Sequence, residues 1–155
     1  MDIAVTDALI LLDLVGNDKE ALLGCMADNL CENGFVKDTY KNAILAREKV
    51  FPTGLPTKPY GVAIPHTDIE HVEKAAVSMA RFQEPVDFSI MGEAAATVPV
   101  KVAFMLAMKE EHAQLDMLQK LMAVLQDQEA LRFLEQEKDT AEIKRFMQEK
   151  LGLKG

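Results

Sequence analysis

Several features that define particular protein classes are scarce in this sequence. Only two cysteines, Cys25 and Cys31, occur in 155 residues, and their spacing places them on different faces of any helix. This pattern indicates neither a disulfide framework nor a zinc site. We expect two buried or half-buried thiols in a reducing cytoplasm. No apolar run is long enough to span a bilayer, and the N-terminus has no positive charge before Lys19, which argues against a secretory signal.

Positive charge is also in short supply. Lysine and arginine together number 17 against 25 aspartates and glutamates, a formal net charge of -8. Such a chain lacks the basic footprint of a nucleic-acid binder, and an anionic membrane surface would repel it. It is better suited to docking basic patches on other proteins. We therefore expect protein partners, with no nucleic acid and no membrane insertion.

What the sequence does contain is an alternation of strand-like and helix-like segments. Apolar runs and period-two alternation predict strands over residues 8–14, 62–64, 75–82, 86–90 and 98–108. Helical spacing and capping signals predict helices from Asn17 or Asp18 to Asn33, from Asp38 to Val50, from about Glu111 to Leu125, and over 128–135 and 140–151. The last four residues are expected to be frayed. This interleaving predicts a single α/β domain over 1–155, with a sheet covered by helices.

The segment from Phe51 to Gly61 interrupts this alternation. It contains three prolines and two glycines, which predicts a loop and no regular element. It is the longest irregular segment of the chain, and long loops within compact domains are disproportionately functional.

His66 directly follows the strand that comes after this loop, in Gly61-Val62-Ala63-Ile64-Pro65-His66-Thr67. Pro65 fixes its own backbone and restricts Ile64, so the turn that presents His66 is stiff. A neutral imidazole held in this way can attack phosphorus through its free nitrogen. For a lone histidine, however, the more common role is to bond backbone groups at the end of a strand.

Other residues could assist such a nucleophile. His112 is predicted in the first turn of a helix, where the helix dipole favours anions and disfavours a charged imidazole. Arg47 could hold phosphate oxygens in a fork, and Thr53 and Thr67 offer hydroxyls. Each has an ordinary alternative: a surface histidine, an arginine paired with Glu48 or solvated, and threonines that form turns.

Two further classes of site find little support. His66 and His71, with Asp68 and Glu70, could suggest a metal site, but a spacing of five does not place both histidines on one helical face, and no HExxH pattern is present. The sequence also has no glycine-rich phosphate loop and no Ser/His/Asp signature. We expect neither a metal nor an organic cofactor.

Taken together, these motifs resemble a known family. Arg47-Glu48, Pro52-Thr53-Gly54-Leu55 and Gly61–His66, followed after an apolar strand by Glu111-His112-Ala113-Gln114-Leu115, are similar to the fructose/mannitol type of enzyme IIA (EIIA) of the phosphoenolpyruvate-dependent sugar phosphotransferase system. The resemblance spans about residues 5 to 150. The form of the segment from Ala46 to Leu55 is most similar to the galactitol-specific branch. The sequence departs from these patterns at two positions. His112 is typical of mannitol and fructose members, whereas not every galactitol-type member keeps a histidine there. Thr67 stands where a glycine is frequent after the active histidine.

The resemblance implies a fold, a chemistry and a set of partners. The fold is a mixed β-sheet flanked by helices on both sides. His66 accepts a phosphoryl group from the small phosphocarrier protein HPr as tele-phosphohistidine, and passes it to a cysteine of the cognate EIIB component, while the membrane component EIIC moves the sugar. His112 stabilises the phosphohistidine and Arg47 neutralises phosphate charge. A regulatory alternative is a nitrogen-type EIIA, in which phosphorylation of the histidine controls binding to other proteins.

Overall fold

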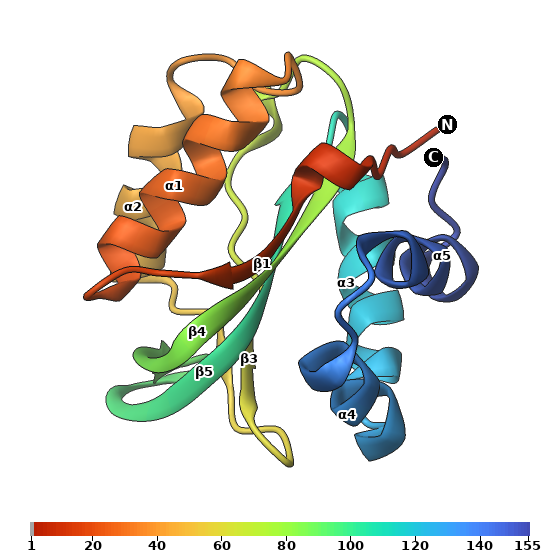
Figure 1. Ribbon diagram of the computed structural model, residues 1–155. Helices are drawn as coiled ribbons and strands as arrows, with labels where there is room; N and C mark the ends of the chain where they lie inside the picture. Colours follow the sequence, from red (N-terminus) through yellow and green to blue (C-terminus); the bar gives the residue numbers. More distant parts are fainter. Residues whose placement is uncertain (1) are drawn as a thin grey trace.

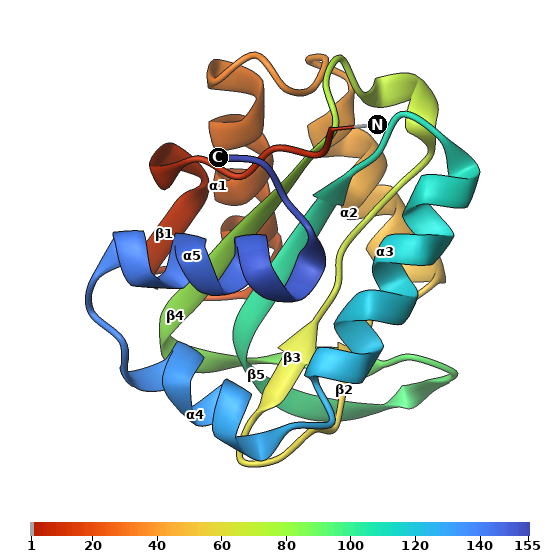
Figure 2. The same cartoon turned by 90° about the vertical axis from the view of Figure 1, so that its right-hand side faces the viewer.

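A five-stranded mixed sheet separates two layers of helices in the computed structural model, which describes residues 2–155 (Figure 1). Helices α1 (Lys19–Glu32) and α2 (Tyr40–Val50) cover one face of the sheet. Helices α3 (Glu111–Val124), α4 (Gln128–Gln136) and α5 (Thr140–Leu151) cover the other face, as the rotated view shows (Figure 2). The predicted α/β class, with helices on both sides of a mixed sheet, is confirmed.

The sheet is organised by one long hairpin, formed by β4 (Ala76–Ile90) and β5 (Glu93–Ala107). Strand β1 (Ile10–Leu14) pairs in parallel with the first half of β4. The short strands β2 (Gly54–Leu55) and β3 (Gly61–Ala63) pair with each other, β2 also with the end of β4 and β3 with β5. The pairings β4–β2–β3–β5–β4 therefore form a closed circuit, and this circuit fixes the loop that leads to His66.

Two glycines make the circuit possible. A Cβ on Gly54 would lie 2.6 Å from the Ser89 carbonyl oxygen, and one on Gly61 would lie 2.6 Å from the Pro99 carbonyl oxygen. These separations are far below van der Waals contact, so any other residue would push the strands apart. The Gly54 carbonyl also accepts a hydrogen bond from the Met91 amide at 2.8 Å, which fastens the loop to the tip of the hairpin.

The sheet divides the apolar core into two clusters. Strand residues such as Val62 and Phe104 pack with Met117 and Leu121 of α3 and with residues of α4 and α5. On the opposite face, Phe82 and other strand residues pack with residues of α1 and α2. Because successive side chains of a strand point to opposite faces, β4 and β5 supply both clusters.

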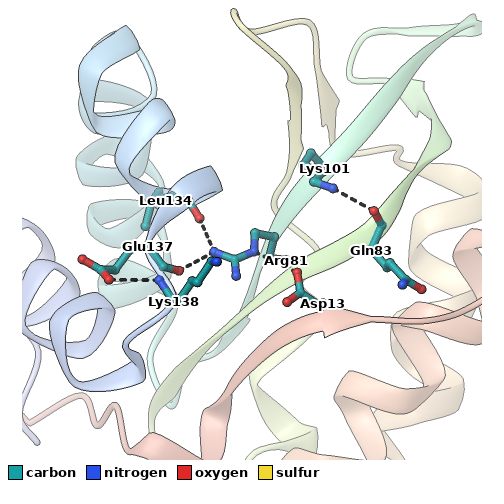
Figure 3. A network of polar contacts seen from close by, with 7 residues as sticks. All are labelled: Asp13, Arg81, Gln83, Lys101, Leu134, Glu137 and Lys138. Carbon is teal, nitrogen blue, oxygen red and sulfur yellow. Dashed lines mark hydrogen bonds and ion pairs between the residues drawn. The ribbon is translucent and has the colours of Figure 1, made fainter.

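The buried Arg81 joins β4 to the end of α4 (Figure 3). Its Nη1 atom donates to the carbonyl oxygens of Leu134 at 3.0 Å and Glu137 at 2.6 Å, and its Nε atom donates to Asp13 Oδ1 at 3.3 Å. The carbonyls at a helix C-terminus lack partners within the helix and carry partial negative charge. Arg81 therefore satisfies the end of α4 and holds this helix against the sheet. Farther along the same hairpin, Lys101 Nζ donates to the Gln83 carbonyl oxygen (Figure 3).

Several predicted boundaries are wrong. The segments predicted as separate strands over 75–82 and 86–90 form one strand, β4, with a register irregularity between Arg81 and Val86. The loop from Phe51 to Gly61 contains the two-residue strand β2. Helix α2 is preceded by Thr39 at its cap position, one residue after the predicted Asp38.

The predictions for the C-terminus and for one cysteine are also wrong. Instead of fraying, the C-terminus is held by the Lys154 amide, which donates to Ile3, and by the Lys154 carbonyl, which accepts from Val5, while Leu153 is buried. This pairing places the segment from Ile3 to Val5 beside the last residues of the chain. Cys25 is exposed, because it lies on the outer face of α1, whereas Cys31 is half-buried. Among residues 2–155, no helix combines the length and apolar character that crossing a bilayer requires.

Candidate functional site

His66 follows the end of β3 by three residues, in a segment that passes close to the start of α3. The backbone there stays attached to the sheet, because the Pro65 carbonyl oxygen accepts from the Leu106 amide at 3.0 Å. The ring is half-buried, and its Nδ1 atom lies 2.8 Å from the Ile64 carbonyl oxygen. Strand pairing and the preceding proline thus fix the position of the imidazole.

The hydrogen bond to Ile64 determines which ring nitrogen can react. A carbonyl oxygen only accepts, so Nδ1 must carry the hydrogen that it donates. In the neutral ring the lone pair then lies on Nε2. Nε2 is therefore the nucleophilic atom of the ring.

The surroundings also keep the ring neutral. Burial lowers the pKa of His66 from its ordinary value of 6.5, the hydrogen bond to Ile64 raises it, and the positive charge of Arg47 lowers it. The net direction is downward. The lone pair is therefore available through the neutral pH range.

Arg47 lies close enough to His66 for its charge to act on the ring. Its guanidinium stacks over the Phe51 ring at 4.6 Å from the centroid, and its Nη1 atom lies 3.6 Å from Asp68 Oδ1. The Nε atom is buried and has no hydrogen-bond partner among residues 2–155. The ion-pair partner of Arg47 is therefore Asp68, near His66, and its Nε–H remains without an acceptor in the described part of the chain. The alternative partner Glu48 bonds to Thr53 instead.

Glu48 is buried and turned toward the loop that follows α2. Its Oε2 accepts from the Thr53 amide at 2.8 Å, and its Oε1 accepts from Thr53 Oγ1 at 2.9 Å. Thr53 Oγ1 in turn accepts from the Ile64 amide at 3.2 Å. The predicted phosphate ligand Thr53 is buried, and in this structure its hydroxyl is engaged by protein groups on both sides.

The first turn of α3 lies on the other side of the His66 segment. Gln114 Nε2 lies 3.4 Å from the Thr67 carbonyl oxygen, and Thr67 itself is buried. His112 is in the first turn of this helix, as predicted, and is exposed. Within residues 2–155, no hydrogen bond joins the rings of His112 and His66, so the structure brings their elements together without joining the side chains.

His71 does not form part of this arrangement. Its Nδ1 atom hydrogen-bonds with Thr39 Oγ1 at 2.8 Å. Within the part of the chain that the structure describes, no group of three or more His, Cys, Asp or Glu side chains is gathered as a metal site would need.

The sequence did not lead us to predict a role beside His66 for three nearby residues: Glu48, Asp68 and Gln114. A signal for Glu48 was present, because Tyr40, Ile44 and Glu48 recur at a spacing of four and all three are buried. A glutamate on the buried stripe of a helix needs partners, which a search for buried charge could have detected. Asp68 and Gln114 depend on tertiary contacts that no local pattern encodes.

A comparison with known protein families finds a match that spans nearly the whole chain. Residues 4–150 match the family described as "Phosphoenolpyruvate-dependent sugar phosphotransferase system, EIIA 2". The chain belongs to this family, and it is thus a phosphotransferase component of the phosphoenolpyruvate-dependent sugar transport system.

The curated proteins to which the chain is similar include sugar-specific components. It is 28% identical over 117 residues to the galactitol-specific EIIA component of Escherichia coli K12, a match that covers 76% of this chain and 77% of that protein. It is 31% identical over 145 residues to the fructose-specific EIIABC component of Bacillus subtilis, covering 90% of this chain but 22% of that longer protein.

Solved structures of similar fold include both sugar-specific and regulatory proteins. The complex of enzyme IIAMTL with phosphorylated enzyme IIBMTL from E. coli matches with a TM-score of 0.75 at 23% identity, covering 97% of this chain and 98% of that one. The nitrogen regulatory protein IIA-Ntr of Neisseria meningitidis matches with a TM-score of 0.74 at 24% identity, covering 92% and 94%. These likenesses establish the shared fold.

Proposed function

We propose that His66 accepts a phosphoryl group from phosphorylated HPr on Nε2 and passes it to a cysteine of a cognate EIIB component. The observation that carries this proposal is the 2.8 Å hydrogen bond from His66 Nδ1 to the Ile64 carbonyl oxygen, which leaves the lone pair on Nε2. A cytoplasmic location and an indirect link to the membrane component EIIC are part of the proposal.

The transfer needs no proton movement at His66. The Nε2 lone pair forms a bond to phosphorus while the phosphorus–nitrogen bond of the donor phosphohistidine breaks. Nδ1 keeps its hydrogen throughout, and the positive charge that develops on the ring is stabilised by the Ile64 carbonyl. In the second step the cysteine thiolate attacks phosphorus, and His66 leaves as a neutral imidazole. Positioning and charge stabilisation supply the catalysis in both steps.

Arg47 is suited to the charge on the phosphoryl group. Its buried Nε has no protein partner within residues 2–155, and a buried donor without a partner is costly unless a ligand satisfies it. A guanidinium can bind phosphate oxygens at two points. We assign Arg47 to neutralising phosphate charge and His112, at the start of α3, to stabilising the phosphorylated state once a partner has docked.

The test is incubation with phosphoenolpyruvate, enzyme I and HPr, followed by intact mass spectrometry. We expect one acid-labile phosphoryl adduct on the wild type and none on His66→Ala, with His71→Ala as the matched control that keeps the adduct. A folded wild-type protein that takes no phosphate, or an adduct that persists in His66→Ala, would refute the proposal.

We propose that the transport system served by this protein takes up galactitol or a related sugar alcohol, because one of the similar proteins is a galactitol-specific EIIA component. The phosphorylated protein should then transfer its phosphate to a galactitol-type EIIB faster than to a mannitol-type EIIB. A phosphorylated protein that transfers to neither would favour the regulatory alternative, in which phosphorylation controls binding to another protein.

A further inference from the structure

A continuous line of hydrogen bonds connects the buried carboxylate of Glu48 to the ring of His66. Glu48 accepts from both the amide and the hydroxyl of Thr53, at 2.8 and 2.9 Å. Thr53 Oγ1 accepts from the Ile64 amide at 3.2 Å, and the Ile64 carbonyl accepts from His66 Nδ1 at 2.8 Å. Four residues from three segments of the chain thus form one chain of contacts that ends at the reactive ring.

The direction of each bond in this line follows from the chemistry of its members. An ionised carboxylate only accepts, so the Thr53 hydroxyl must give its hydrogen to Glu48. The lone pairs of that hydroxyl are then free to accept from the Ile64 amide. Ile64 is held at its amide by Thr53 and is restricted on its other side by Pro65, so its carbonyl has a fixed orientation.

We propose that Glu48 is a positioning residue for His66: through Thr53 and Ile64 it selects the Nδ1–H form of the ring and aims Nε2 outward. The expected effect on the transfer rate rests on the proposed function, whereas the hydrogen position on the ring can be measured without any transfer. Thr53 accordingly orients the backbone at Ile64 and does not itself bind the phosphoryl group.

The burial of Glu48 agrees with this role. Removal from water raises the pKa of Glu48 above its ordinary value, although the two hydrogen bonds from Thr53 and the charge of Lys19 act in the opposite direction. A carboxylate is expensive to bury unless hydrogen bonds satisfy it. Because both oxygens of Glu48 accept from Thr53, they hold the Thr53 hydroxyl in the orientation that leaves a lone pair for the Ile64 amide.

Two substitutions interrupt the line with little change in shape. Thr53→Val keeps the branched side chain and removes the hydroxyl. Glu48→Gln keeps the length but introduces an amide group that donates where an acceptor is required. Thr53→Ser keeps the hydroxyl and serves as the rescue variant. Thr57→Val is the matched control, because the Thr57 hydroxyl lies in the same loop and donates to the Tyr60 carbonyl at 2.6 Å, outside the line.

The first measurement is ¹⁵N NMR of the imidazole, which distinguishes Nδ1–H from Nε2–H rings. We expect wild type, Thr53→Ser and Thr57→Val to hold His66 in the Nδ1–H form. Thr53→Val and Glu48→Gln should show a mixture of the two forms. Wild-type ring spectra in both folded variants would overturn the inference, whether or not the protein accepts phosphate.

The second measurement is the rate of phosphorylation by phosphorylated HPr, followed by mass spectrometry. We expect Thr53→Val and Glu48→Gln to slow acceptance by about 10- to 100-fold, the range that misplacement of a reacting group costs, with Thr53→Ser close to wild type. A lower melting temperature with an unchanged rate would reduce Glu48 to a structural role. If Thr53→Val does not fold, Glu48→Gln decides the question. A wild type that takes no phosphate refutes the proposed function and leaves the ring measurement valid.

Discussion

Arg47 Nη1 lies 3.6 Å from Asp68 Oδ1, so an arginine of α2 is paired with an acid two residues beyond His66. The pair is partly exposed, and an exposed ion pair adds little stability. Its consequence is geometric: together with the stack on Phe51, it holds a cation beside the imidazole without consuming the Nε donor. The site therefore combines a neutral nucleophile with a fixed positive charge.

His66 is expected to titrate below the ordinary histidine value of 6.5. Burial is the main cause, since it disfavours the charged ring, and Arg47 acts in the same direction. Because only the neutral ring is nucleophilic, phosphate acceptance should persist as the pH falls to 6.5 and should decline only at lower pH. A ¹⁵N titration of the ring measures this directly, and a midpoint at or above 6.5 would contradict it.

Removal of the Arg47 charge should raise the pKa of His66. Arg47→Gln eliminates a cation that opposes protonation of the ring, so the NMR titration midpoint should move upward. Arg132→Gln, on the exposed side of α4, is the matched control and should leave the midpoint unchanged. The same Arg47 variant should lose its phosphoryl group to hydrolysis faster than wild type, because the phosphate charge is no longer balanced. A midpoint that stays in place would remove Arg47 from the electrostatics of the ring.

The buried hydroxyl of Tyr40 is expected to stabilise the fold without taking part in transfer. It donates to the Leu106 carbonyl oxygen at 2.6 Å and thereby ties α2 to β5. Tyr40→Phe removes the donor and leaves that carbonyl unpaired, which should lower the free energy of unfolding by about 1–3 kcal/mol. Chemical denaturation measures this loss. Phosphate acceptance should stay within about twofold of wild type, and a stability equal to wild type would show that the bond contributes nothing.

Arg81 should have a larger effect on stability. Arg81→Met keeps much of the apolar stem but leaves the carbonyls of Leu134 and Glu137 without their donor. We expect the free energy of unfolding to fall by about 2–3 kcal/mol, with faster hydrogen exchange in α4. Lys101→Met, on the same hairpin but bonded only to the exposed Gln83 carbonyl, is the control. Equal losses in the two variants would contradict the role assigned to Arg81.

Local patterns were sufficient to predict most helices and strands. The cap at Asp18, whose side chain accepts from the Ala21 amide at 2.8 Å, is a sequence signal that the structure confirms. The stop at Gly34 is another, since its φ of 83° suits glycine. Both features depend on residues a few positions apart, which a sequence displays directly.

Features that depend on distant segments were not predictable in this way. Lys154 pairs with Ile3 and Val5, which lie near the opposite end of the sequence. No local sequence pattern predicts a pairing between such distant residues. The same is true of Thr53 and Ile64, whose bond exists because β2 and β3 pair. Sequence reasoning therefore proposed His66 as the nucleophile and named its candidate helpers, whereas the orientation of the ring required the structure.

His112 is expected to matter for onward transfer more than for acceptance. It is exposed and does not hydrogen-bond to His66, so it adds nothing to the nucleophile of the free protein. His112 is in the first turn of α3, and Gln114 of the same helix contacts the Thr67 carbonyl next to His66, so we expect His112 to reach a phosphoryl group already on Nε2 once a partner has docked. His112→Gln should therefore accept phosphate from HPr at close to the wild-type rate but pass it to EIIB about 10-fold more slowly, the loss expected for one hydrogen bond of about 1.4 kcal/mol in the transition state. His71→Gln, whose ring bonds to Thr39 away from the site, is the control. Single-turnover transfer separates the two steps, and onward transfer at the wild-type rate would show that His112 has no part in it.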